Sequence, residues 1–372
     1  MEKTKVVIAS VLKPIDDTRM FEKFGLSMAK TNKYAINIIG FASKNVRSHE
    51  GIQFHDLGNF PRLSWARYRA KWKVYRQYLK VRPHIIIVNT HELLIVTVIF
   101  KIFFGAKIVY DVRENYLKNT RHTQAFPTLL RPFISTWVRL KEIITKPFFN
   151  RFILAERVYA RQMGFLPASA TIVENKYKAL EPTEEIQRPL LPDTIDLVYT
   201  GTISRGNGAF EAISIAKALH KLNPAIRLKL VGYCAIKNDL KDLQEAIQEE
   251  SFIELIGGDY LVPHEQIVKE IANADFGFVL KKPNNGINDE KLLTRLFEYT
   301  AHHLPILMLN NPTWISFCNE FNAAIAINPA DYDPKALLDQ MLAGGFYSKG
   351  DTSSSLWETE EARFLSLIDE LA

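Results

Sequence analysis

The sequence has few cysteines and no long apolar run, and each shortage excludes a class of protein. Its 372 residues include only two cysteines, Cys234 and Cys318, which lie far apart and outside any C-x-x-C pattern. A disulfide framework and a structural zinc site are therefore not indicated, and a reducing compartment fits best. The longest apolar run, residues 93–100, stops at Lys101. Because a membrane-spanning helix needs roughly 18 such residues, we expect no bilayer crossing.

Signals for export, metal binding and repeats are also missing. The apolar stretch at residues 6–9 is too short for a signal peptide, so we expect the chain to begin in the cytoplasm. No Asp-x-Asp follows a strand pattern and no His/Cys cluster occurs, so we expect no metal cofactor. No internal period of about 20 to 50 residues marks a solenoid.

Acidic residues are scarce in the first half of the chain. Residues 1–180 contain 31 Lys and Arg against 12 Asp and Glu (31 − 12 = +19), whereas residues 181–372 contain 16 against 29 (16 − 29 = −13). An asymmetry of this size indicates that the first half meets an anionic partner. The remaining composition, 47% hydrophobic and 24% charged, is that of a folded globular protein.

Short apolar runs alternate with helical patterns along the whole chain, which predicts an α/β protein with parallel sheets covered by helices. The predicted strands cover residues 6–10, 35–40, 52–55, 84–89, 107–110, 152–155, 196–200, 227–232, 252–257, 276–280 and 305–309.

The proline-rich segment 179–194 cannot form a central strand and is predicted to be a linker. It separates two Rossmann-like domains, residues 1–178 and 195–355, which are expected to face a cleft. A final helix over 356–371 is expected to pack back on the first domain. Ligands of such sheets bind at the carboxyl ends of the strands, which is where we look for the site.

Two acidic residues, Glu290 and Glu298, are separated by seven positions. Apolar residues at helical spacing predict a helix over 291–302 that starts beside Glu290. The free amides of its first turn would form an anion site, at Leu292, Leu293 and Thr294. Spacing alone equally permits a structural role for the two acids, as a helix-terminal and a solvated carboxylate.

The run Arg-Leu-Phe-Glu-Tyr-Thr-Ala around Glu298 resembles the E-x7-E element of retaining GT-B glycosyltransferases, where Lys-Leu-Phe-Glu-Tyr-Met-Ala is common. The resemblance covers nearly the whole chain. Residues 199–206, Tyr-Thr-Gly-Thr-Ile-Ser-Arg-Gly, are similar to the family's turn that presents a basic residue to the donor diphosphate. Residues 109–116, Val-Tyr-Asp-Val-Arg-Glu-Asn-Tyr, resemble its "yDvHE" segment.

The resemblance implies a GT-B fold and transfer of a sugar, with retention, from a UDP- or GDP-linked donor to a glycan or lipid-linked acceptor, without a metal. It implies that Glu298 accepts hydrogen bonds from the nucleotide ribose. Glu290 would contact the donor sugar, and Arg205 would pair with the departing diphosphate, so these two are the catalytic candidates. The other donor-binding candidates are Gly201, Thr202, Gly206, Tyr260, Val262, Leu292, Leu293 and Thr294.

Two positions depart from the family pattern. Arg113 stands where the family usually has His, and arginine cannot act as a base. Thr202 replaces a usual arginine, for which Lys282, Lys291 or Arg295 are the candidate substitutes. The candidate acceptor-binding residues are Asp17, Arg19, His91, Glu92, Arg113 and Glu114. A capping or structural role for the His-Glu pair at 91–92 is the alternative.

Residues 62–82 contain eight basic residues and no acid, with aromatic residues at three- and four-residue steps. This pattern predicts a basic amphipathic helix, with Trp72 and Tyr75 in the core. The basic remainder favours an anionic membrane surface, contacted through Arg67, Arg69, Lys71 and Lys73. Nucleic acid is not expected, because no binding motif is present and the second half is acidic.

We therefore interpret the chain as a retaining glycosyltransferase that is cytoplasmic and peripheral at the inner face of the cell membrane. Two alternatives stay open. One is a nucleotide-sugar 2-epimerase on the same fold. The other is a catalytically silent GT-B subunit that binds lipid or a partner protein.

Overall fold

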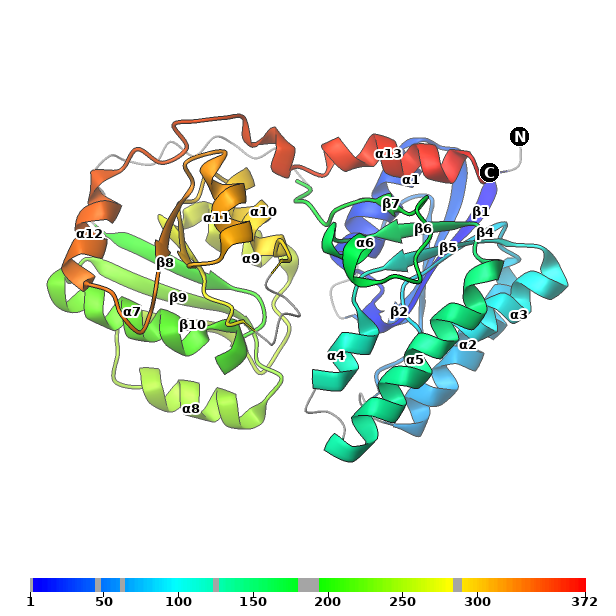
Figure 1. Ribbon diagram of the computed structural model, residues 1–372, viewed down its shortest axis with the longest axis horizontal. Helices are drawn as coiled ribbons and strands as arrows, with labels where there is room; N and C mark the ends of the chain where they lie inside the picture. The colour runs from blue at the N-terminus through cyan, green and yellow to red at the C-terminus, as the bar shows by residue number, and fades with distance from the viewer. Residues whose placement is uncertain (1–2, 44–47, 61–63, 123–126, 180–193, 284–289) are drawn as a thin grey trace. The chain divides into compact units, whose positions relative to one another are not determined.

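The computed structural model describes residues 3–43, 48–60, 64–122, 127–179, 194–283 and 290–372. It divides the chain into two compact units (Figure 1). Unit 1 comprises Met1–Leu180 together with Trp357–Ala372, and unit 2 comprises Glu181–Leu356. The predicted linker, 179–194, lies outside the described residues except at its two ends.

Unit 1 contains a seven-stranded parallel sheet in the order β3-β2-β1-β4-β5-β6-β7. Its strands are β1 (Thr4–Pro14), β2 (Tyr34–Phe41), β3 (Ile52–Asp56), β4 (Ile85–Val88), β5 (Lys107–Val112), β6 (Arg151–Leu154) and β7 (Thr171–Ile172). The order reverses between β1 and β4, as in a Rossmann sheet. All four residues of β4 are buried. The strand is apolar throughout because helices cover both faces of the sheet and leave no position facing water.

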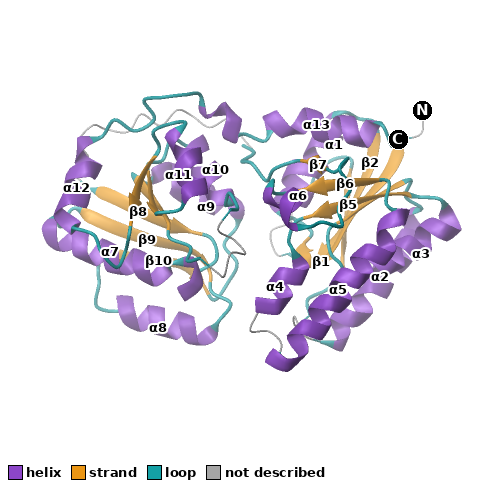
Figure 2. Ribbon diagram, in the orientation of Figure 1, coloured by secondary structure: helices purple, strands orange, loops and turns teal. Residues whose placement is uncertain are grey.

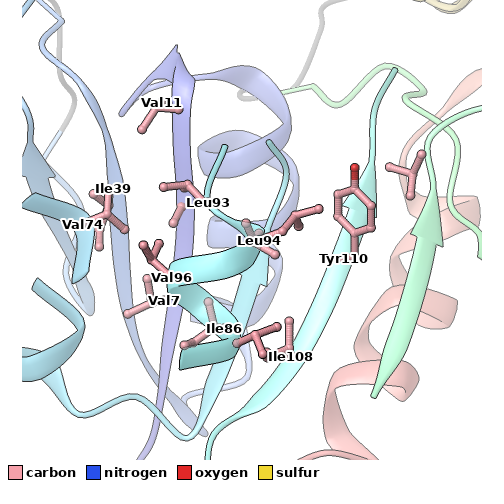
Figure 3. Close-up of a cluster of buried hydrophobic side chains, with 14 of the residues drawn as sticks. Val7, Val11, Ile39, Val74, Ile86, Leu93, Leu94, Val96, Ile108 and Tyr110 are labelled. Atoms are coloured by element: carbon pink, nitrogen blue, oxygen red, sulfur yellow. The ribbon is translucent and has the colours of Figure 1, made fainter. Parts of the chain in front are cut away.

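Helices cover both faces of this sheet (Figure 2). The helices of unit 1 are α1 (Leu26–Lys30), α2 (Trp65–Val81), α3 (Leu94–Phe104), α4 (Tyr116–His122), α5 (Arg131–Thr145), α6 (Val158–Gln162) and α13 (Glu358–Asp369), with a π-helix over Thr18–Gly25. On one face, Val74 of α2 and Val96 of α3 pack against Val7 and Ile86 of the strands (Figure 3). Helix α3 also packs against α2 and α5.

The C-terminal helix α13 belongs to the opposite face of unit 1. Trp357, which precedes it, is buried and donates from Nε1 to the Ser27 hydroxyl at 2.9 Å. Phe364 stacks on Phe24 with ring centroids 4.2 Å apart. Lys176 and Glu360 form a buried ion pair at 2.8 Å. The chain therefore returns to unit 1 after unit 2 is complete.

Unit 2 repeats the same strand order in a six-stranded parallel sheet, β10-β9-β8-β11-β12-β13. Its strands are β8 (Ile195–Thr200), β9 (Ile226–Tyr233), β10 (Ile253–Gly258), β11 (Phe276–Val279), β12 (Ile306–Leu309) and β13 (Ala324–Ile327). Its helices are α7 (Ala209–Leu222), α8 (Lys237–Ile247), α9 (His264–Asn273), α10 (Thr294–Ala301), α11 (Pro312–Asn319) and α12 (Pro334–Ala343). The order reverses between β8 and β11, which places the candidate ligand edge beside Thr200.

The structure corrects the predicted elements at three places. The edge strands β7 and β13 are not among the predicted strands, because β7 has only two residues and β13, at the sheet edge, is mostly not buried. The predicted helix over 291–302 begins late, at Thr294, because Leu293 is extended with ψ 142°. Trp314 holds the preceding loop by donating from Nε1 to the carbonyl of Lys291 at 2.7 Å.

None of the described helices combines the length and hydropathy needed to cross a bilayer.

Candidate functional site

A tight turn follows β8 at the carboxyl edge of the unit 2 sheet. Gly201 has φ +95°, a conformation that favours glycine, and a Cβ there would lie 3.0 Å from the guanidinium of Arg295. The buried Tyr199 hydroxyl lies 2.9 Å from the carbonyl oxygen of Thr202 and 3.1 Å from that of Asn207. The Tyr199 hydroxyl therefore holds the backbone of the turn in place, and the missing side chain of Gly201 leaves room for Arg295.

The guanidinium of Arg295 lies beside this turn. Its guanidinium carbon lies 4.9 Å from the centre of the Tyr199 ring. Its Nη1 atom is buried and has no hydrogen-bond partner among the described residues. Leaving a buried charged donor unpaired costs roughly 1–3 kcal/mol or more. The arrangement is therefore suited to an anionic group that accepts from Nη1.

Glu298 lies one turn further along α10. The Nε2 atom of His264, the first residue of α9, is 3.3 Å from Glu298 Oε1. This contact holds the carboxylate between two helices, where it can accept hydrogen bonds from hydroxyl groups. Glu290 is exposed and precedes α10 by four residues, so the structure does not place it at a helix N-terminus.

Two other predicted cations of unit 2, Arg205 and Lys282, have carboxylate partners. Arg205 is 55% exposed, pairs with Asp242 and lies 3.7 Å from Asp239. Lys282 pairs with Glu211 at 2.6 Å. Of Lys282 and Arg295, two of the candidates for the cation that Thr202 does not supply, Arg295 therefore has the arrangement better suited to a ligand.

The ten predicted donor-binding residues all follow strands at one edge of the unit 2 sheet. Gly201, Thr202, Arg205 and Gly206 follow β8, Tyr260 and Val262 follow β10, and Leu292, Leu293, Thr294 and Glu298 follow β11. Leu292 and Leu293 lie in the loop before α10, so their amides do not belong to the first turn of the helix. Tyr260 is exposed and Val262 is buried.

Unit 1 carries a cavity of about 360 Å³ at the carboxyl edge of its own sheet. Lys13 at the end of β1, Asn89 and Thr90 after β4, and Arg113 and Glu114 after β5 contribute to its lining. A larger cavity of about 670 Å³ lies at the amino ends of β1, β2 and β3. Because ligands of such sheets bind at the carboxyl edge, the smaller cavity is the candidate site.

Two buried polar side chains at this cavity lack partners. Asn89 is 1% exposed, and within the described part of the chain neither atom of its side-chain amide is hydrogen-bonded. The buried Thr90 hydroxyl is also unpaired there. Buried polar groups are almost always paired in folded proteins, so two orphans beside a cavity indicate a polar ligand. Sequence analysis missed both residues, since no motif distinguishes them.

An ion pair closes one side of the same cavity. The two terminal nitrogens of Arg113 donate to the carboxylate of Asp17 at 2.7 and 3.1 Å. Burial opposes ionisation of Asp17, but the Arg113 guanidinium and Lys13 hold the pKa of Asp17 well below its ordinary value. The pair stays charged over the whole physiological range. It brings together two residues that the sequence places 96 positions apart.

Known structures match this chain over its full length. Sucrose-phosphate synthase from Thermosynechococcus elongatus superposes with a TM-score of 0.69 at 13% identity, covering 99% of both chains. HepE from Anabaena, in complex with UDP and glucose, gives a TM-score of 0.63 at 12% identity, covering 99% of this chain and 100% of HepE. Both share the arrangement of two parallel-sheet units described above. The chain has the GT-B fold.

The same fold includes a Listeria monocytogenes protein assigned as a UDP-N-acetylglucosamine 2-epimerase, with a TM-score of 0.59 at 12% identity over 99% of this chain and 96% of that one. No protein-family model and no curated protein sequence matches the chain.

Within the GT-B fold of this chain, His91 and Glu92 have internal partners. Lys141 donates to His91 Nδ1 at 2.9 Å, and Arg67 pairs with Glu92. Burial lowers the pKa of His91 to about 4 in spite of the nearby Glu92 carboxylate, so the ring is neutral near pH 7. Neither residue lines the cavity. The structure therefore favours the structural alternative for this pair.

Arg19 is also an internal residue. Its side chain is fully buried, donates to Asp111 at 2.8 Å and to the carbonyl of Val173 at 3.0 Å. The ion pair joins the π-helix to β5 and stabilises unit 1. The structure does not support the predicted acceptor contact of Arg19.

Helix α2 differs from its prediction in which side it buries. Ala70, Val74 and Tyr78 form its buried side, while Trp72 is 47% exposed. The expected core position of Trp72 is therefore wrong, whereas Tyr75 is partly buried against the core. Of the predicted surface cations, Arg69 and Lys73 are exposed, Lys71 lies over the Tyr68 ring at 3.6 Å, and Arg67 pairs with Glu92.

Across the ranges that the structure describes, no three His, Cys, Asp or Glu side chains gather in a way that could hold a metal ion.

Proposed function

We propose that this protein is a retaining glycosyltransferase that moves a sugar from a nucleotide-sugar donor to a glycan or lipid-linked acceptor. The observation that carries the proposal is the cluster of Gly201, Arg295 and Glu298 at the reversal point of the unit 2 sheet, on a GT-B fold. HepE, which shares the fold, was crystallised with UDP and glucose. A UDP- or GDP-linked sugar is the proposed donor.

The donor would lie across the carboxyl edge of unit 2. Glu298, held by His264, would accept hydrogen bonds from the ribose hydroxyls. The buried Nη1 of Arg295 would donate to the diphosphate where the Gly201 turn lets it approach. Glu290 would contact the hydroxyls of the transferred sugar. Tyr260 would contact the base.

Charge grows on the diphosphate as the glycosidic bond breaks. Preorganised cations that bind this charge stabilise the transition state more than the ground state. We assign this role to Arg295 and to the more exposed Arg205. The proposed reaction uses no metal cofactor, since guanidinium groups of the chain supply the positive charge.

The acceptor would enter the cavity of unit 1. The unpaired amide of Asn89 and hydroxyl of Thr90 are suited to sugar hydroxyls, and Glu114 adds a carboxylate acceptor. Arg113, where the family usually has His, is tied to Asp17 and would orient the acceptor rather than accept its proton. The basic residues of α2, of which Arg69 and Lys73 are exposed and Arg67 and Lys71 half-buried, support action at the cytoplasmic membrane face.

Product analysis tests the proposal. The enzyme would be incubated with UDP- and GDP-sugars and with glycan or lipid-linked acceptors, and the new anomeric centre would be assigned by proton NMR. We expect a product whose anomeric configuration matches the donor. An inverted product would contradict the retaining mechanism, and donor binding without any transfer would favour the silent-subunit alternative.

The 2-epimerase alternative has one observation in its favour, the fold shared with the Listeria protein. An epimerase needs no acceptor, so the same NMR assay without acceptor separates the two functions. Conversion of the donor into its C2 epimer would identify an epimerase. We expect an unchanged donor apart from slow hydrolysis.

A further inference from the structure

Helix α5 presents its apolar side to the surface of unit 1. Phe133, Trp137, Leu140 and Ile144 recur at the i, i+4, i+7, i+11 spacing of a single helix face. All four are exposed, Phe133 at 75% and Trp137 at 54%. In an ordinary amphipathic helix this face would pack into the core. Here it is the outer face.

The inner side of α5 is mostly polar, with Val138 as its one buried apolar residue, and is fixed by hydrogen bonds. Tyr110 of β5 donates to Glu142 Oε1 at 2.9 Å, and Arg121 of α4 donates to the Ser135 hydroxyl at 3.2 Å. Glu142 and Ser135 are fully buried. Rotating α5 to bury its apolar side would break these bonds and expose both partners. The outward orientation is therefore built into the packing of the unit.

The apolar surface extends onto the neighbouring helix. Lys101 near the end of α3 donates to the carbonyl of Phe148 at 2.7 Å, so the end of α3 lies beside the end of α5. There Ile102 and Phe103 are exposed. Of the 21 exposed large apolar side chains in the described chain, 15 lie between residues 65 and 148. Patches of this kind mark an interaction surface. We call the outward residues of α3 and α5 the α3–α5 surface.

The charge around this surface is predominantly positive. Residues 57–155 contain 18 Lys and Arg and 4 Asp and Glu. Helices α2, α3 and α5 together contain one acid, Glu142, and that residue is buried. The exposed cations on α2 include Arg69, Arg76 and Lys80. A second copy of the chain docked on this face would bring two basic rims together without acids to pair with.

We infer that the α3–α5 surface inserts into the interfacial layer of an anionic bilayer, with the cations of α2 at the headgroups. Exposed aromatic and aliphatic side chains beside Lys and Arg are the composition of helices that lie in this layer, about 5–10 Å deep. The inference deepens the membrane part of the proposed function and rests on it for its biological setting. It names insertion, and not charge alone, as the main attachment.

Vesicle co-sedimentation separates insertion from charge attraction. The probe is vesicles of phosphatidylglycerol and phosphatidylcholine, and the insertion variant is Phe133→Gln, Trp137→Gln, Leu140→Gln, Ile144→Gln. A matched control replaces exposed apolar residues of unit 2: Leu222→Gln, Leu261→Gln, Leu342→Gln. A charge variant replaces exposed α2 cations: Arg69→Gln, Arg76→Gln, Lys80→Gln.

Salt is the second variable, because raising it from about 0.1 M to about 1 M shortens the Debye length from about 10 Å to about 3 Å. We expect wild type and the unit 2 control to stay bound at high salt. The charge variant should bind less at low salt. The insertion variant should lose at least about tenfold in vesicle affinity and be released completely at high salt. Release of wild type by salt alone, or unchanged binding of the insertion variant, would overturn the inference.

A second readout uses the conservative variant Trp137→Phe, which keeps an aromatic side chain at this exposed position. Brominated lipid should quench wild type more than Trp137→Phe, because Trp137 enters the bilayer. Equal quenching would contradict insertion at α5. A protein that forms a dimer without lipid and does not bind vesicles would also overturn the inference. In that case a second copy of the chain would cover the α3–α5 surface. UDP binding is measured on the same samples, so loss of the donor function and loss of the membrane function are distinguishable.

Discussion

Among the individual residues, two arginines near the unit 2 turn differ in their surroundings. Arg205 is exposed and held by two aspartates, whereas Arg295 is half-buried and its Nη1 atom is buried without a hydrogen-bond partner among the described residues. Sequence reasoning assigned the diphosphate to Arg205 and named Arg295 only as one of three substitutes. Burial and pairing decide between them, and both depend on neighbours such as Tyr199 that are distant in sequence.

We predict that Arg295→Met lowers affinity for UDP by about 10- to 100-fold, since a hydrogen bond to a charged group contributes about 1.5–3 kcal/mol. Uridine, which has no phosphate, should bind equally to both proteins. Arg295→Lys should recover part of the loss. Isothermal titration calorimetry measures the affinity of wild type, Arg295→Met and Arg295→Lys for UDP and for uridine. Equal UDP affinity in wild type and Arg295→Met would exclude the phosphate contact.

Arg205→Ala should behave differently. Because its proposed contact strengthens only as charge develops on the leaving group, we expect a lower kcat with little change in UDP affinity. Steady-state kinetics with a donor and an identified acceptor provide the test. A raised KM at unchanged kcat would contradict a transition-state role.

Glu298 and Glu290 should also separate by their kinetic effects. Glu298→Ala removes the proposed ribose contact and should weaken UDP binding by roughly tenfold, from about 1 kcal/mol or more. Glu290→Ala should chiefly lower kcat, because Glu290 is proposed to contact the transferred sugar. It should leave UDP affinity unchanged, since UDP carries no sugar to be transferred. Glu298→Gln, which keeps one acceptor oxygen, is the milder control. Wild-type kinetics in both alanine variants would contradict the assignment of Glu298 and Glu290 to the donor site.

Asn89 shows what sequence alone cannot reveal, since a single asparagine carries no sign of being buried and unpaired. We predict that Asn89→Leu raises the free energy of unfolding by about 1 kcal/mol, because it removes an unsatisfied buried amide. The same change should raise the KM for the acceptor and leave that for the donor unchanged. Urea unfolding and acceptor kinetics report the two effects. A destabilised variant with normal acceptor KM would show a purely structural amide.

At the level of helices and strands, periodicity located the elements but not their orientation. The spacing of apolar residues identified α2, yet Trp72 faces outward while Ala70 and Val74 face the sheet. Helix α5 reverses the usual rule for most of its length: Ser135 and Glu142 are buried, while Phe133 and Trp137 are exposed. Periodicity reports which residues share a face, and only the partners across the interface determine which face is buried.

Helix α5 supplies a pH test of this orientation. Burial raises the pKa of Glu142 from 4.5 to about 7, although Arg139 and the Tyr110 hydroxyl oppose the shift. The folded state then binds a proton that the unfolded state has lost between these values, so this group makes stability fall as pH rises from about 4.5 to about 7. The part of the slope due to Glu142 should be missing in Glu142→Gln. The free energy of unfolding would be measured by urea titration at several pH values. The same pH dependence in wild type and Glu142→Gln would show that Glu142 is solvated and not buried.

The architecture of the whole chain follows from its most redundant signal. Alternating strand and helix patterns recur over both halves, so the α/β class survives errors at single elements such as β7 and β13. The E-x7-E wording added the GT-B expectation, and full-length matches to solved structures support it. The cavity of unit 1 was harder to predict, because Lys13, Asn89 and Arg113 come from three separate strand ends.

The central claim is that unit 2 binds a nucleoside diphosphate through Arg295 and Glu298. The most direct measurement is the thermal unfolding of wild type and of the Arg295→Met, Glu298→Ala double variant against UDP, GDP and ADP. At 100 times its dissociation constant, a ligand of the folded state adds about 2.7 kcal/mol of stability. The account predicts a raised melting temperature of wild type with UDP or GDP and no rise in the double variant. No rise for wild type with any of the three, or an equal rise in the double variant, would contradict it.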